Sequence, residues 1–124
     1  MKLHGQRWLF EIGNSVVKVD NAFSLLGWAQ ERLIVNDEIA GQAGQWFAMR
    51  RNFAEPWLSM LGDSELKVSM FARVGSVECV VELDGERLEP ALLQEATWSG
   101  RRGLWPDEQA WRETVNFVWD RWGS

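Results

Sequence analysis

The sequence predicts a mainly β fold, an antiparallel β-sandwich or open barrel of about seven to nine strands with a C-terminal amphipathic α-helix over residues 106–121. Two observations support this prediction. Over residues 7–90, short runs of alternating or β-branched apolar residues are separated by Gly, Asn, Asp or Ser, which is typical of antiparallel strands. Beyond Pro90, the apolar residues change to the spacing of a helix.

The first predicted hairpin joins residues 7–12 to residues 16–20 through the turn at residues 13–15. Side chains alternate along a strand, so every second residue shares a face. The apolar side chains expected to face one another in this hairpin are Trp8, Phe10, Ile12, Val17 and Val19.

Later strands are expected at residues 32–35, 38–42, 46–49, 57–61, 66–70 and 77–83. The last two alternate strictly and form the most regular predicted hairpin, which turns at residues 74–76. Residues 32–42 and 79–90 also resemble each other, because each has a strand, an Asn-Asp or Asp-Gly turn and a short return. Two similar hairpins are therefore expected in equivalent places in the sandwich.

The C-terminal part, residues 91–124, is expected to hold a helical turn at 91–95, a loop at 99–103 and the helix. Pro106 suits the first turn of that helix. One face of the helix would carry Trp111, Val115, Val118 and Trp122. Phe117 lies off this stripe, which indicates either a helix covered on two sides or a contact with a partner or a second copy.

Length and composition indicate one soluble globular domain over residues 1–124. Of its 124 residues, 46% are hydrophobic and 25% are charged, and no stretch is low in complexity. The net charge is −5, with basic residues scattered except for two Arg-Arg pairs, which disfavours nucleic acid and anionic membranes as partners. The chain shows no secretory signal or membrane-spanning stretch, and it has a single cysteine, Cys79. We therefore expect a cytoplasmic protein.

The sequence offers no recognisable catalytic arrangement. His4, the single histidine, is expected near a frayed terminus, where it would make a poor general base. Cys79 falls on the apolar side of a predicted strand and is interpreted as a structural thiol. Glu78 and Glu82 are interpreted as members of solvated ion pairs rather than as an acid–base pair. We expect no catalytic residue, metal site or cofactor, and hence no enzyme.

The chain contains nine Trp and no Tyr. Periodicity assigns Trp8, Trp111 and Trp122 to the core. The candidates for a binding site lie instead near loops and strand starts: Trp28, Trp46, Trp57, Trp98, Arg101, Arg102 and Trp105. Residues 98–105 place two Trp around a doubly basic loop, which could stack a base, a sugar or an acidic peptide. The alternative is a plain connector whose Trp side chains fasten it to the sheet.

Residues 16–20, 31–37 and 78–88 share a strand-and-turn pattern: VVKVD, then ERLIVND, then ECVVELDGERL. This pattern resembles that of the Fas apoptotic inhibitory molecule family over residues 7–90 at most. The resemblance implies a non-catalytic β-sandwich that works by interaction. Two departures stand out, because residues 24–27 read SLLG where that family has a Gly-rich turn, and the predicted Trp-rich helix has no counterpart there. No functional residue is carried over.

Two functions follow as hypotheses. The first is a small cytoplasmic domain that catalyses nothing and binds a protein partner or a second copy of itself, such as an inhibitor that covers a basic active site. The second is a carrier that holds a small sugar or a hydrophobic ligand in a Trp-lined groove or barrel mouth.

Overall fold

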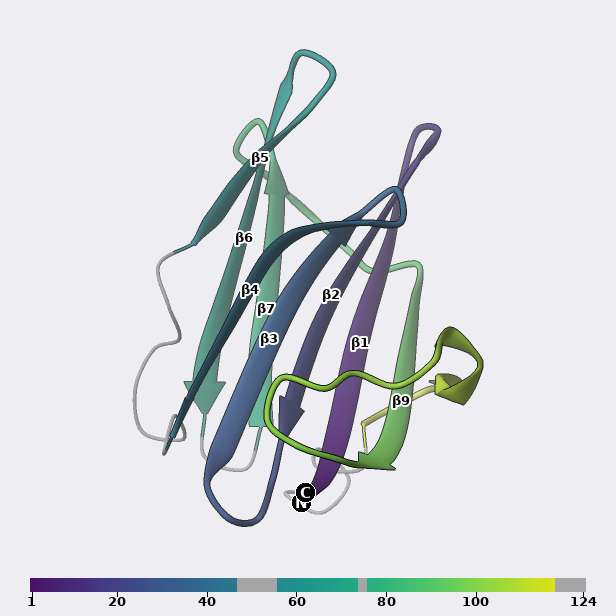
Figure 1. Cartoon of the computed structure of the whole chain (residues 1–124). Helices are drawn as coiled ribbons and strands as arrows, with labels where there is room; N and C mark the ends of the chain where they lie inside the picture. The colour runs from purple at the N-terminus through teal and green to yellow at the C-terminus, as the bar shows by residue number, and fades with distance from the viewer. Residues whose placement is uncertain (47–55, 74–75, 118–124) are drawn as a thin grey trace.

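The computed structural model describes residues 1–46, 56–73 and 76–117, which form two antiparallel sheets (Figure 1). The larger sheet has six strands in the order β10-β9-β1-β2-β3-β4. Its strands are β1 (Lys2–Ile12), β2 (Ser15–Phe23), β3 (Trp28–Val35), β4 (Glu38–Trp46), β9 (Leu92–Ser99) and β10 (Arg112–Thr114). The smaller sheet, in the order β5-β6-β7-β8, holds β5 (Trp57–Leu61), β6 (Ser64–Arg73), β7 (Ser76–Leu83) and β8 (Glu86–Leu88).

The two sheets enclose the apolar core, and Figure 1 shows the smaller sheet lying obliquely behind the larger one. The register of β1 and β2 pairs Trp8 with Val19 and Phe10 with Val17, which confirms the faces predicted for the first hairpin. The smaller sheet adds Leu66, Val68, Met70 and Val81 to the same buried cluster. We call the core side of the six-stranded sheet its inner face and the opposite side its outer face. The fold is sandwich-like, and neither sheet closes into a barrel within the described residues.

The two similar hairpins predicted from residues 32–42 and 79–90 are β3–β4 and β7–β8. Asn36 and Asp37 have φ of 49° and 67°, and Asp84 and Gly85 have φ of 49° and 83°. Two successive positive φ values are the signature of the type I′ turn, which matches the twist of a two-residue hairpin. Each hairpin ends its sheet, since β4 and β8 are edge strands.

The predicted helix over residues 106–121 is wrong in the part that the structure describes. Residues 108–110 form a single 3-10 turn, η2 (Glu108–Ala110), and β10 follows it at the sheet edge. Trp111 lies on the outer face, where its ring is 4.3 Å from the Arg7 guanidinium carbon, and Phe117 lies on the inner face against Trp8. A chain that passes along the sheet edge can place side chains on both faces, whereas a helix would keep its apolar stripe on one side.

Three smaller predictions are also wrong. The expected helical turn at residues 91–95 is not formed, because residues 92–95 belong to β9, which pairs with β1. Val115, predicted on the buried helix stripe, is 88% exposed, and Phe117, predicted off the stripe, is 2% exposed. His4 lies within β1 rather than in a frayed end. Trp46 ends β4, and residues 47–49 of the strand predicted there lie outside the described residues, as do Val118 and Trp122.

A long connection between β9 and β10, residues 100–111, crosses the outer face of the six-stranded sheet in front of β1, β2 and β3 (Figure 1). We call these residues the strap. At its start, the Gly100 amide donates a hydrogen bond to the Met1 carbonyl at 2.9 Å, and the Met1 amino group donates to the Gly100 carbonyl at 2.8 Å. Within the described ranges, no helix has the length and apolar character needed to cross a membrane.

Candidate functional site

A buried ionic network joins three neighbouring strands on the outer face. The side chains of Arg7 in β1, Asp20 in β2 and Arg32 in β3 lie side by side because the register pairs each with the next. Asp20 accepts hydrogen bonds from Arg7 Nε at 2.6 Å, from Arg7 Nη2 at 2.9 Å and from Arg32 Nε at 2.7 Å. One carboxylate thus serves two guanidinium groups, and charge-assisted bonds of this length are strong.

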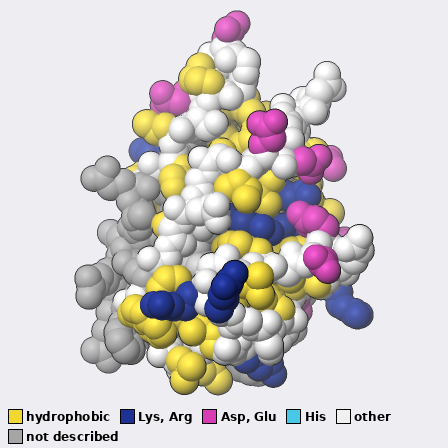
Figure 2. All heavy atoms as spheres, in the orientation of Figure 1, with side chains coloured by type: hydrophobic (Ala, Val, Ile, Leu, Met, Phe, Trp, Pro, Cys, Tyr) yellow, Lys and Arg dark blue, Asp and Glu magenta, His cyan; other side chains and the backbone are white. Residues whose placement is uncertain are grey.

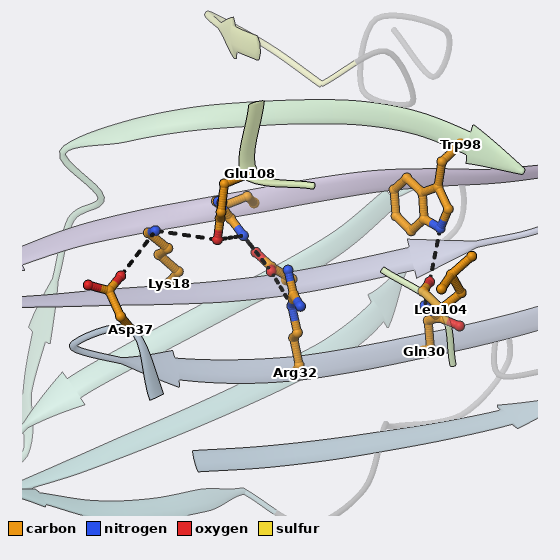
Figure 3. Close-up of polar contacts among 9 residues, drawn as sticks. Lys18, Gln30, Arg32, Asp37, Trp98, Leu104 and Glu108 are labelled. Atoms are coloured by element: carbon orange, nitrogen blue, oxygen red, sulfur yellow. Dashed lines mark hydrogen bonds and ion pairs between the residues drawn. The ribbon is translucent and has the colours of Figure 1, made fainter. Parts of the chain in front are cut away.

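The strap supplies the second carboxylate of this network. Glu108 accepts a 2.6 Å hydrogen bond from Arg7 Nη1, and Lys18 Nζ lies 3.6 Å from Glu108 Oε1 (Figure 3). Burial acts to raise the pKa of Glu108, but the hydrogen bonds and positive charge of Arg7, with Lys18 and Arg32, lower it overall. Glu108 is therefore held as a carboxylate, and it fixes the strap over Arg7.

The Trp rings of the strap cover the same two arginines. The Trp111 ring centre lies 4.3 Å from the Arg7 guanidinium carbon, and the Trp105 ring centre lies 4.5 Å from that of Arg32. Both distances suit cation–π contacts. Gly5 makes room for Trp98 and Trp111, since a Cβ at that position would stand 2.5 Å from Trp98 Cζ3 and 2.9 Å from Trp111 Cη2.

Gln30 anchors the other end of the strap. Its Oε1 accepts hydrogen bonds from Trp28 Nε1 at 2.7 Å and from the Gly103 amide at 2.8 Å. Its Nε2 donates to the Leu104 carbonyl at 2.9 Å, and Trp98 Nε1 donates to the same carbonyl at 2.9 Å (Figure 3). A buried glutamine thus connects Trp28 to the strap backbone, and Trp98 binds that backbone directly.

Next to Gln30, aromatic and basic side chains meet at the surface. Trp28 and Trp46 are cross-strand partners with ring centres 5.3 Å apart in an edge-to-face arrangement. The Arg102 guanidinium carbon lies 5.6 Å from the Trp28 ring centre and 5.5 Å from that of Trp46. Gly44 leaves space for Trp28, because a Cβ there would stand 2.5 Å from Trp28 Cζ2. The strand register and the strap together create this cluster.

We call these residues, with their exposed neighbours, the Trp–Arg surface: Trp28, Trp46, Trp98, Arg102 and Leu104. Trp46 is 40% exposed and Leu104 is 43% exposed. Figure 2 shows hydrophobic side chains gathered with basic ones on the lower part of this face, while acidic side chains gather above them. The surface is locally basic although the chain as a whole is acidic.

The structure brings most of the sequence-predicted site residues together. Trp28, Trp46, Trp98 and Arg102 belong to the Trp–Arg surface, and Trp105 lies beside Trp98 with ring centres 5.8 Å apart. Arg101 is exposed on the same strap. Trp57 is separate from them, since it belongs to β5 and packs against the core cluster. The strap is thus both a fastened connector and the support of an exposed aromatic surface.

A second group of polar residues lies on the inner face, and the sequence interpretation missed it. Gln6, Asn21 and Glu31 are consecutive cross-strand partners on β1, β2 and β3, and all three are buried. Gln6 also lines a cavity of about 620 Å³. A signal was present in the sequence, because each polar residue stands two positions from a core residue on its strand. Side chains alternate between the two faces of a strand, so each polar side chain points to the same side as the core residue.

The residues considered for catalysis take part in packing or in an ion pair. His4 stacks on Phe23 with ring centres 5.7 Å apart, and its pKa is lowered by burial and by the charge of Lys2. Cys79 packs against the core cluster, and burial raises the pKa of its thiol. Glu78 lies 3.8 Å from Arg87 in an ion pair. Within residues 1–46, 56–73 and 76–117, no three His, Cys, Asp or Glu side chains are grouped as a metal site.

No family model, curated protein or solved structure matches this chain. The resemblance to the Fas apoptotic inhibitory molecule family therefore stays a prediction.

Proposed function

We propose that this protein is a non-catalytic binding domain, acting in the cytoplasm, whose Trp–Arg surface contacts an acidic segment of a protein partner. Trp and Arg are the residues most enriched among those that carry the binding energy of protein interfaces. The large flat Trp side chain buries much area at a low entropic cost, and the Arg guanidinium binds a carboxylate through two parallel hydrogen bonds. The proposal is of the same class as the function that the resemblance to the Fas apoptotic inhibitory molecule family implies.

The observation that carries the proposal is the position of Arg102 over two Trp rings at the surface. In the described part of the chain, the ion pairs of arginine involve Arg7, Arg32 and Arg87, and none involves Arg101 or Arg102. The guanidinium groups of Arg101 and Arg102 therefore keep their donors for a carboxylate from outside. This charge selects an acidic segment, in place of the basic active site expected from the net charge alone.

The strap also prepares the surface for binding. Glu108 and Gln30 hold it at both ends through hydrogen bonds of 2.6–2.9 Å to side chains of the sheet. A surface that is already ordered loses less conformational entropy when a partner arrives. This arrangement favours a specific interface over loose apolar contact.

Selection of peptides that bind the full chain, from a displayed random peptide library, tests the proposal. We expect the selected peptides to combine Asp or Glu with an apolar residue. Trp46→Ala and Arg102→Glu should each weaken their binding by about tenfold or more. The matched controls, Met60→Ala and Lys67→Glu, change exposed residues of the other sheet and should leave binding unchanged. Selection of no peptide, or equal losses in the controls, would contradict the proposal.

A second copy of the chain is the other candidate partner. Sedimentation equilibrium at increasing protein concentration distinguishes the two. If the wild-type chain dimerises and Trp46→Ala abolishes the dimer, the Trp–Arg surface serves self-association rather than an acidic segment.

A further inference from the structure

The inner face of the six-stranded sheet changes from apolar to polar along its strands. Trp8, Val19 and Leu33 form one cross-strand row that belongs to the core. Two residues away on each strand, the next row on the same face is Gln6, Asn21 and Glu31. A polar row thus continues the core toward the end of the sheet at which β1 begins.

This polar row has more hydrogen-bonding atoms than partners. The three residues are 3%, 1% and 2% exposed, and Gln6 Nε2 donates to Asn21 Oδ1 at 3.1 Å. Gln6 Oε1, Asn21 Nδ2 and Glu31 Oε2 find no hydrogen-bond partner in the described part of the chain. Each buried polar atom without a partner costs about 1–3 kcal/mol, so three adjacent ones call for a partner from outside the sheet.

A cavity opens beside this row at Gln6. Its volume of about 620 Å³ lies within the usual range for small-molecule sites. The lining includes His4 and Phe23, whose rings stack on each other, together with Thr97 and Arg112. Arg112 is the cross-strand partner of Glu95, which also lines the cavity, so one positive and one negative charge balance there.

We propose that this cavity binds a small uncharged molecule with several hydroxyl groups, of the monosaccharide class, which donates a hydrogen bond to Gln6 Oε1. A hydroxyl group can donate to the free acceptor on Gln6, which is the member of the polar row that lines the cavity. The apolar side of a sugar ring suits the flat surface of His4 and Phe23. The site is distinct from the Trp–Arg surface, because none of the residues that line it belongs to that surface.

The charge of the site argues for an uncharged ligand. Burial raises the pKa of Glu31 to about 8, so its carboxyl is mostly protonated at neutral pH and does not attract a cation. The pKa of His4 is lowered, so its imidazole is neutral as well. An anion would meet Arg112 only together with Glu95.

Nuclear magnetic resonance titration of the full chain tests the proposal at the atoms concerned. The probes are glucose, galactose, mannose, ribose and myo-inositol, with tetrahydropyran as a ring of similar size that carries no hydroxyl. We expect saturable shifts of the Gln6 and Asn21 side-chain amide signals with one or more of the hydroxylated probes, and no such shifts with tetrahydropyran.

Gln6→Met keeps the side-chain length, removes the acceptor and should weaken the binding of the responding probe by about tenfold. Gln42→Met, at an exposed position of β4, is the matched control and should bind as the wild-type protein does. Three results would overturn the proposal: no response to any hydroxylated probe at tens of millimolar, an equal response to tetrahydropyran, or shifts confined to Trp28 and Trp46. The probe comparison uses the wild-type chain, so it decides the question even if Gln6→Met fails to fold. Peptide binding at the Trp–Arg surface is tested separately, by the peptide selection described above.

Discussion

Arg7 and Asp20 form a two-point ion pair across β1 and β2, with nitrogen–oxygen distances of 2.6 and 2.9 Å, where their side chains are only 1% and 0% exposed. Asp20 also binds Arg32, and Glu108 of the strap binds Arg7 from above. Burial acts to lower the pKa of Arg7, but Asp20 and Glu108 raise it overall, so the guanidinium stays charged. The ionic network and the strap are therefore one structural unit, and the Trp–Arg surface depends on it.

Asp20→Asn should destabilise the protein by about 3–5 kcal/mol, because it leaves two buried guanidinium groups without their shared carboxylate. Urea denaturation followed by Trp fluorescence measures the loss. Asp37→Asn is the control, since Asp37 is 93% exposed and lies 3.9 Å from Lys18. That change should cost less than about 1 kcal/mol. Similar losses in the two variants would show that the Asp20 network has no special weight.

Phe117→Ala should cost about 3 kcal/mol or more, because the Phe117 ring is buried and meets Trp8 edge-on with centres 5.1 Å apart. Val115→Ala, at a position that is 88% exposed, should change stability by less than about 0.5 kcal/mol. Thermal or urea unfolding compares the two. The predicted helix would require the opposite order, so a larger loss at Val115 would favour the helix over β10.

Glu31→Gln should remove a pH dependence of stability. The pKa of Glu31 is about 8 in the folded protein against an ordinary value of 4.5, so the folded state binds more protons between these values. The contribution of Glu31 to the free energy of unfolding is therefore fully present below pH 4.5, and it is lost as pH rises toward 8. Glu31→Gln should become more stable than wild type over this window, by on the order of 4 kcal/mol at its upper end. Urea titrations at several pH values measure the difference, and parallel profiles for the two proteins would refute it.

The Cys79 thiol should react slowly with a disulfide reagent in the native protein. It packs against the core, and burial raises its pKa, an effect that the nearby Arg87 charge opposes only in part. Labelling should accelerate in urea in proportion to the unfolded fraction. Fast labelling in native buffer would show instead that the thiol is accessible and ionised.

Local sequence patterns were enough for most of the larger architecture. The alternation of Trp8 with Phe10, and of Val17 with Val19, correctly predicted which side chains meet in the core. The Asn-Asp and Asp-Gly pairs predicted two hairpins that turn as expected. These features depend on residues close in sequence, so they can be derived without knowing the rest of the chain.

The C-terminal part could not be predicted in this way. Trp111 and Val115 have helical spacing, but the chain there forms β10. In this arrangement Trp111 contacts Arg7 on one face of the sheet, and Phe117 contacts Trp8 on the other. Contacts with a sheet about a hundred residues earlier in the chain thus outweigh the local periodicity. A pattern within one segment carries no information about such distant partners.

By itself, the sequence determined a β-rich chain with two similar hairpins, an inward apolar face and a set of Trp and Arg residues suited to binding. Only the tertiary structure decided that Trp28, Trp46 and Arg102 form one surface while Trp57 packs against the core. It also decided that Gln6, Asn21 and Glu31 form one buried row. The physical reason is the same in both cases, because strand register and the path of the strap depend on pairing between residues far apart in the chain.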